Sequence, residues 1–457
     1  MLSRSVLSRQ SRRAATKQST QLTGRRGLAA PASGSFQYET GTAAGVKFAS
    51  RDVPGPTTQL AIVAKAGTRY EPLPGLTIGL QNFAFKNTER RSTIRIQRES
   101  ELLGADLFAR HSREALVIGA KFLRDDLPYF AELLAEVVGQ TKYLDYVHHE
   151  EVEGVVKLQQ KRFLGDVKEL ASNSAYGLAF HRGLGTPLYP ASSSPLQKYL
   201  SANTIGAFAS MAYSKPNFAV VANGADSTEL SKWVNEFFPS VRASPSQEIP
   251  QQQTKYFGGE ERIAHGSGNA MVIAFPGSSS FTGGFYKPEL SVLAELLGGQ
   301  TTIKWSPGFS LLSKVASKYP GASIKTKSDI FSDAGLLTIS LSGSATDMRK
   351  ASSEVVDAIK QIANGVSKED FTKAKALAKF KELEFGQNVS AGLELTGSGL
   401  IHGNQAYQID EVAKKVDGVT EEQLKSAAKS LLEHKASVSS VGDLYALPYA
   451  EEIGLKV

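Results

Sequence analysis

Cysteine is absent from all 457 residues of the chain. Its absence excludes disulfides, thiolate-bound metals, cysteine nucleophiles and the attachment of c-type haem. The sequence also lacks any run of about 18 apolar residues, so it predicts no membrane-spanning helix. Hydrophobic residues make up 41% of the chain and charged residues 21%. This is the composition of a folded globular protein, and the length suits two or three domains.

Acidic residues are missing from the first 38 positions, which are rich in Ser, Thr and Ala. The basic residues in that stretch are Arg4, Arg9, Arg12, Arg13, Lys17, Arg25 and Arg26. Such a composition is typical of an organelle transit peptide, and we predict a mitochondrial presequence of residues 1–28, cleaved after Leu28. The remaining chain would balance 45 basic against 45 acidic residues. Without an excess of positive charge on the folded body, we expect no nucleic-acid partner; the alternative is a basic tail that stays attached.

Strand-like apolar segments recur along the chain in the same order and at nearly constant spacing. Those of the first half are 60–64, 115–119 and 218–222, and their counterparts 211, 220 and 218 residues later are 271–275, 335–339 and 436–440. A fixed period of this size indicates the duplication of one domain.

Helical patterns alternate with these segments. Residues 127–140 have helical spacing, and Thr420 to Gln423 form a capping-box sequence that predicts a helix start. The fold class that follows is α+β: a tandem duplication in which each half is a mostly antiparallel sheet covered by helices. Around a polar, Pro- and Gln-containing stretch we place a linker. The predicted boundaries are 29–240 for the first half, 241–262 for the linker and 263–457 for the second half.

A set of sequence words between residues 66 and 114 carries a resemblance to a known family. The words are AGTRYE at 66–71, GLTIGLQNFAFKNT at 75–88, ELLGA at 101–105 and SRE at 112–114. In this order they resemble the metallopeptidase family of the mitochondrial processing peptidase and the core proteins of the cytochrome bc1 complex. That family is itself a tandem duplication, so the resemblance extends from about residue 36 to the end. Its active members carry H-x-x-E-H on a helix.

The chemistry of that motif depends on residues that this chain lacks. Two histidines four positions apart bind Zn²⁺ on one helix face, and the Glu between them takes a proton from the metal-bound water. Carried over by the resemblance, the histidine positions are Ile78 and Asn82, and the base position is Gln81. The third ligand of the family, a Glu about 80 residues on, falls near Gln159. We therefore expect no catalytic residue, no metal and no cofactor.

Two other patterns receive a structural interpretation. The run His148-His149-Glu150-Glu151 does not predict a metal site, because adjacent residues of a regular helix face different directions; we interpret it as a solvated helix start. The words Gly266-Ser267-Gly268 and Gly397-Ser398-Gly399 lack the third glycine of a nucleotide-binding fingerprint, and we expect them to be loops.

The segment from Gly298 to Leu312 separates two kinds of non-catalytic relative. After Gly298 and Gly299 it departs into an Ile-Lys-Trp-Ser sequence at 303–306, with one further glycine. It lacks the long glycine-rich loop of the processing peptidase's non-catalytic subunit, and is similar to the core protein 2 group of the family, in its fungal versions.

That resemblance implies a structural and assembly subunit of ubiquinol–cytochrome c reductase (respiratory complex III), peripheral to the matrix side of the mitochondrial inner membrane. The implied partners are a core protein 1-like paralogue and the cytochrome b, cytochrome c1 and Rieske subunits. The alternative is the non-catalytic, peptide-binding alpha subunit of the processing peptidase. A peptidase with a non-standard site is a further alternative.

Overall fold

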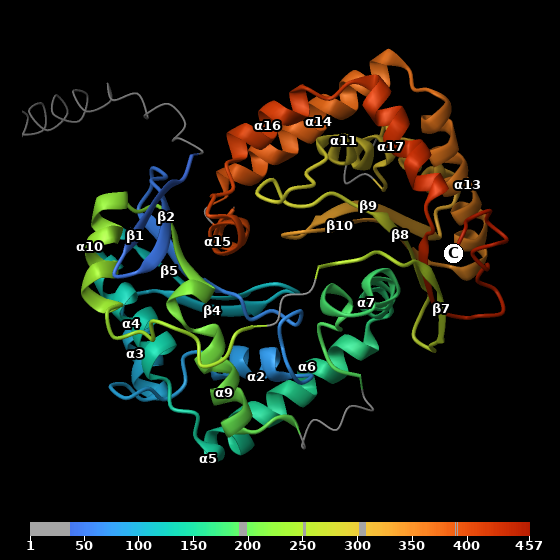
Figure 1. Ribbon diagram of the computed structural model, residues 1–457. Helices are drawn as coiled ribbons and strands as arrows, with labels where there is room; N and C mark the ends of the chain where they lie inside the picture. The colour runs from blue at the N-terminus through green and yellow to red at the C-terminus, as the bar shows by residue number, and fades with distance from the viewer. Residues whose placement is uncertain (1–36, 192–198, 250–252, 301–307, 389, 391) are drawn as a thin grey trace, which may run out of the picture.

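The structure is a computed structural model of the chain, and it contains two sheets, each covered by helices (Figure 1). The residues that it describes are 37–191, 199–249, 253–300, 308–388, 390 and 392–457. The predicted presequence and the Ile-Lys-Trp-Ser segment lie outside these ranges. None of the helices within them is long and apolar enough to span a bilayer.

The first half contains a six-stranded sheet with the order β1-β2-β6-β3-β5-β4. Its strands are β1 (Glu39–Ala43), β2 (Val46–Arg51), β3 (Thr57–Ala64), β4 (Asp106–His111), β5 (Leu116–Leu123) and β6 (Phe218–Asn223). All neighbours are antiparallel except β2 and β6. Ile62 of the central strand β3 pairs with Ile118 on one side and with Val220 on the other. These β-branched pairs form the middle of the sheet, which is buried on both faces.

The second half repeats this arrangement in a five-stranded sheet with the order β7-β11-β8-β10-β9. Its strands are β7 (Gly259–Ala264), β8 (Ala270–Pro276), β9 (Ala322–Ile330), β10 (Gly335–Gly343) and β11 (Ser437–Gly442). Here too a single pair, β7 with β11, is parallel. Matching β2-β6-β3-β5-β4 with β7-β11-β8-β10-β9 aligns every strand of the repeat. The predicted duplication and fold class are confirmed, and an ordered strand begins at Gly259 within the range expected for the linker.

Helices cover both faces of the two sheets. In the first half they are α2 (Leu76–Phe83), α3 (Thr93–Leu102), α4 (Leu127–Gln140), α5 (Asp145–Val147), α6 (Glu153–Gly165), α7 (Val167–Phe180), α9 (Ala202–Ala212) and α10 (Ser227–Phe237). In the second half they are α11 (Pro288–Leu297), α12 (Leu311–Lys318), α13 (Ala345–Asn364), α14 (Lys368–Gln387), α15 (Leu393–Gly403), α16 (Ile409–Asp417) and α17 (Glu421–Glu433). Helix α4 has the predicted bounds, and α17 begins after a capping box between Thr420 and Gln423.

Each half also contributes one helix to the sheet of the other half (Figure 1). Helix α7 packs its Ala-rich face on β8 and β11, and α15 packs on β2, β3 and β6. Gly397 of α15 faces strand β3 of the first sheet, and a Cβ atom added at this position would stand 2.4 Å from Val63. The expectation of a loop at Gly397-Ser398-Gly399 is therefore wrong, because these residues are helical and Gly397 lets the helix lie close to the sheet.

Candidate functional site

Helix α2 carries the three motif positions, and its N-terminus is fixed by a buried carboxylate. Gly75 precedes the helix with a positive φ of 95°, a conformation that suits glycine. Oε2 of Glu71 accepts hydrogen bonds from the backbone N–H groups of Gly75 and Thr77, at 3.2 and 3.1 Å. Burial raises the pKa of Glu71 to about 8, although these bonds oppose the shift. The helix start is thus held by one side chain.

The structure brings three of the four motif positions into one chain of contacts. Nδ2 of Asn82 donates to Oε1 of Gln159, on α6, at 3.1 Å, and to the backbone O of Ile78 at 2.9 Å. The side chain of Ile78 belongs to the hydrophobic core and is 1% exposed as a residue. Helices α2 and α6 therefore place positions 82 and 159 opposite one another.

Gln81 faces a histidine that sequence reasoning assigned no role. Nδ1 of His111, at the end of β4, contacts the amide of Gln81, and its Nε2 lies 3.1 Å from the backbone O of Leu188. Burial lowers the pKa of His111, so the ring is neutral and can donate a hydrogen bond from only one nitrogen. The only signal for this residue was its place directly before the SRE word.

These side chains open onto a polar cavity of about 510 Å³. Its lining residues are Gln81, Arg110, His111, Gln159, Arg162, Phe163, Asp166, Glu169, Leu188 and Tyr189. Two basic and two acidic groups balance in charge, and the Tyr189 ring packs on His111 and Phe163 at centroid distances of 5.3 and 4.7 Å.

The donor set at the motif positions does not fit Zn²⁺. Zinc in proteins takes imidazole nitrogen, thiolate or carboxylate ligands. Positions 78, 81, 82 and 159 offer an alkyl group and three neutral amides. An amide also cannot take the proton of a water nucleophile, which a catalytic base must do.

A second polar cluster joins the two halves. Arg69 donates from Nη1 to Oε1 of Glu114 and to Oδ1 of Asp333, and from Nη2 to Oδ2 of Asp333, each at 2.7 Å. Glu114 accepts in turn from the backbone N of Ser332 at 2.8 Å, and Asp333 from Oγ1 of Thr254 at 2.9 Å. Burial by itself lowers the pKa of Arg69, but the hydrogen bond with Asp333 and the nearby acidic groups raise it overall. This cluster connects the first half to the β9–β10 loop.

Arg113 anchors α7, the helix that crosses to the second sheet. It donates to the backbone O of Leu184 at 2.8 Å and to Oδ1 of Asn173 at 3.0 Å, and its guanidinium lies 4.0 Å from the centre of the Tyr176 ring. The hydroxyl of Tyr176 donates to Oδ2 of Asp329 in β9 at 2.7 Å. Burial lowers the pKa of Arg113 to about 10. The AGTRYE and SRE words thus contribute to the junction between the halves.

Comparison with known proteins matches both halves to one peptidase family. Residues 47–174 match the family model "Insulinase (Peptidase family M16)", and residues 199–377 match "Peptidase M16 inactive domain". Among curated proteins, the chain is 52% identical over 459 residues to "Cytochrome b-c1 complex subunit 2, mitochondrial" of Neurospora crassa, covering 100% of both chains.

Two further relatives show how the similarity decreases. The Schizosaccharomyces pombe protein of the same name is 36% identical, covering 90% of this chain and 93% of its own. "Probable mitochondrial-processing peptidase subunit alpha-1, mitochondrial" of Arabidopsis thaliana is 26% identical, over 90% and 83%. The predicted resemblance to fungal core protein 2 is thereby confirmed. The chain belongs to the family of the mitochondrial cytochrome b-c1 complex subunit 2 proteins, with two halves built on the M16 peptidase fold.

Proposed function

We propose that this chain is a non-catalytic, structural subunit of the mitochondrial cytochrome b-c1 complex, the ubiquinol–cytochrome c reductase of respiratory complex III. The observation that carries the proposal is the 52% identity to the Neurospora crassa protein of that name over the full length of both chains. Similarity over the whole length, rather than over one domain, means that both halves and their junction are shared with that relative.

The motif positions are, in this proposal, a zinc site that has been lost. Asn82 and Gln159 occupy facing positions on α2 and α6, and a hydrogen bond joins them. Neither amide replaces an imidazole or a carboxylate as a zinc ligand. Ile78 contributes its side chain to the core instead of to the polar cavity. The peptidase fold then serves as a scaffold, and electron transfer is carried out by other subunits.

The place of the subunit follows from the complex. We place it on the matrix side of the inner membrane, peripheral to the bilayer, after removal of residues 1–28. Its partners there are a core protein 1-like paralogue and the cytochrome b, cytochrome c1 and Rieske subunits. The interlocked halves support a scaffolding role, because the Arg69 cluster and the exchanged helices α7 and α15 hold the two sheets together.

Isolation of the native assembly tests this function. Detergent-solubilised mitochondria are fractionated, the fractions are probed with an antibody against this chain, and haem absorption is recorded. We expect the chain to co-migrate with haems b and c at a constant ratio. Recovery from the soluble matrix, with a zinc-containing partner and without haem, would instead establish the processing-peptidase alpha subunit. Zinc-dependent hydrolysis of a presequence peptide by the purified chain would refute the non-catalytic assignment.

A further inference from the structure

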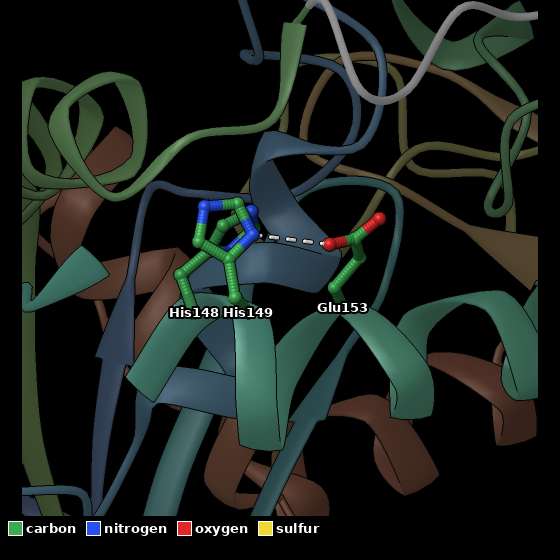
Figure 2. A group of neighbouring side chains, drawn as sticks. All are labelled: His148, His149 and Glu153. Atoms are coloured by element: carbon green, nitrogen blue, oxygen red, sulfur yellow. Dashed lines mark hydrogen bonds and ion pairs between the residues drawn. The ribbon is translucent and has the colours of Figure 1, made fainter. Parts of the chain in front are cut away.

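A group of two histidines and one glutamate lies where α5 leads into α6, outside the polar cavity described above. Figure 2 shows His148, His149 and Glu153 above the first turns of this helical segment. One potential ligand atom from each of the three residues lies within 4.8 Å of the other two. The sequence did not predict this grouping, because adjacent residues of a regular α-helix face different directions.

The backbone explains why the two histidines come together. Residues His148–Val152 form a π-helical turn between α5 and α6. A π turn has hydrogen bonds between residues i and i+5, so it is wider than an α turn and consecutive side chains diverge less around the axis. Such turns occur frequently at functional sites. The two rings lie with their centroids 5.1 Å apart.

His148 has the properties of a preformed ligand. The residue is 2% exposed, its ring stacks on Phe83, and its Nδ1 has no hydrogen-bond partner in the described part of the chain. A hydrogen bond joins the His148 ring to the backbone of Leu200. A carbonyl that accepts the other ring N–H is the usual support of a ligating histidine.

His149 and Glu153 supply the accessible side of the group. Nδ1 of His149 lies 3.2 Å from Oε2 of Glu153, and the His149 side chain is 68% exposed, which leaves a path for an ion. Oε1 of Glu153 accepts from Lys157 at 2.6 Å, so the carboxylate is held in orientation.

The surrounding charges favour a cation. The acidic groups of the same segment are Asp145, Glu150, Glu151 and Glu153, and the basic groups paired with them are Lys86 and Lys157. Lys86 neutralises Glu151 and Lys157 neutralises Glu153, so two carboxylates remain to offset the charge of a bound ion.

We propose that His148, His149 and Glu153 bind a divalent cation of the zinc class. Two imidazoles and one carboxylate form a ligand set that Zn²⁺ prefers, with a fourth position open to water or to a side chain of a neighbouring protein. Ligands at about 2.0–2.1 Å from a tetrahedral ion are about 3.3 Å apart. The His149–Glu153 contact already has this spacing, and rotation of side chains brings the third ligand to it. None of the four lost motif positions takes part.

Titration of the purified full chain, without a histidine tag, tests the site. Zn²⁺ affinity is measured by competition with a chromophoric chelator, and Co²⁺ absorption reports the coordination geometry. We expect one tightly bound ion per chain. His149→Gln and Glu153→Gln should each weaken binding at least about 10-fold, because each removes a ligand.

Matched variants separate this site from other binding. His434→Gln removes an exposed histidine elsewhere and should bind like the wild type. Glu150→Gln removes an acid of the same segment that is not a ligand, and it should weaken binding less than the loss of a ligand does. His148→Gln should also weaken binding, but because that residue is buried, the decision rests on the two more accessible ligands. Undiminished binding in His149→Gln or Glu153→Gln overturns the proposal. A wild-type Kd for Zn²⁺ above about 1 mM, which corresponds to only about 4 kcal/mol, overturns it too.

Discussion

From the Arg69 cluster we predict that the charge of this one side chain, at the junction of the two halves, stabilises the whole chain. The perturbation is Arg69→Met, which keeps most of the length of the side chain and removes its charge. In the wild type, the Arg69 and Glu114 side chains are 3% and 7% exposed, and that of Asp333 is 28% exposed. The variant leaves one carboxylate buried without its cation and a second one partly accessible to water.

The size of the effect follows from these exposures. Removing one member of a buried ion pair costs about 3–5 kcal/mol, because the remaining charge stays desolvated. Burial and the neighbouring Asp333 already raise the pKa of Glu114, and Arg69 opposes that shift. Water can reach the Asp333 carboxylate, so this group contributes less to the loss of stability. We therefore expect Arg69→Met to lower the free energy of unfolding by about 3–4 kcal/mol near pH 7. Adding Glu114→Gln should recover more than half of the loss.

Urea denaturation followed by circular dichroism measures these differences. A matched control is Arg95→Met, which breaks an exposed pair with Glu99 and should cost less than about 1 kcal/mol. A double-mutant cycle between Arg69 and Glu114 should give a coupling of at least about 1.5 kcal/mol. If Arg69→Met costs no more than Arg95→Met, or if the cycle shows no coupling, the ion pairs of Arg69 do not stabilise the junction.

Three further variants test other parts of the structure. Ile78→His, Asn82→His and Gln159→Glu combined should create a zinc site at α2 and α6, while any two of them should not, since three protein ligands are needed. Glu71→Gln should become less destabilising as the pH rises from about 5 to 9. Burial raises the pKa of Glu71 in the folded chain to about 8, so this side chain stabilises the fold fully at a pH below its unfolded pKa. As the pH rises toward 8, that contribution to the free energy of unfolding is lost at up to roughly 1.4 kcal/mol per pH unit. Gly397→Ala should destabilise the chain by about 1–3 kcal/mol, because the new Cβ would overlap β3.

Controls accompany each of these measurements. The zinc variants are made with His149→Gln, so that the ion bound at α2 is counted alone. Urea titrations at several pH values give the Glu71 result, and a difference between variant and wild type that does not change with pH would contradict it. For Gly397→Ala the control is Gly154→Ala. A Cβ atom added at Gly154 would have no atom within 4 Å besides its chain neighbours and its own helix backbone, so the helix should gain up to about 1 kcal/mol. Equal gains at both glycines would contradict close packing of α15.

Local sequence patterns predicted many of the helices and strands. The bounds of α4 followed from helical spacing, the start of α17 from a capping box, and three strands of each half from the repeat. The donor chemistry of the motif positions can be taken from the sequence, because it is a property of each residue itself. The structure adds that Asn82 and Gln159 are in contact.

The packing between the two halves could not be predicted from the sequence, because it depends on contacts between distant segments. Nothing in the pattern of α7 tells which of two similar sheets it covers, and a partner of Arg69 that lies 264 positions away leaves no local signal. The wrong expectation at Gly397 had the same cause, since glycine reads as a loop signal until the opposing strand is known. For His148 and His149 the assumption of α-helical geometry failed, because the backbone there is a π turn.

The exchange of α7 and α15 has a consequence for the order in which the molecule can be completed. The last strand of the first sheet, β6, ends at Asn223, whereas the helix that covers its outer face begins 170 residues later at Leu393. When the chain is delivered from its N-terminus, that apolar face stays uncovered until these 170 residues have followed. Of the two strands on which α7 packs, β8 follows it by 90 residues and β11 lies beyond α15, so its packing surface is also completed late. Neither half can reach its final state without an element of the other, so the apolar faces of both sheets depend on the presence of the whole chain.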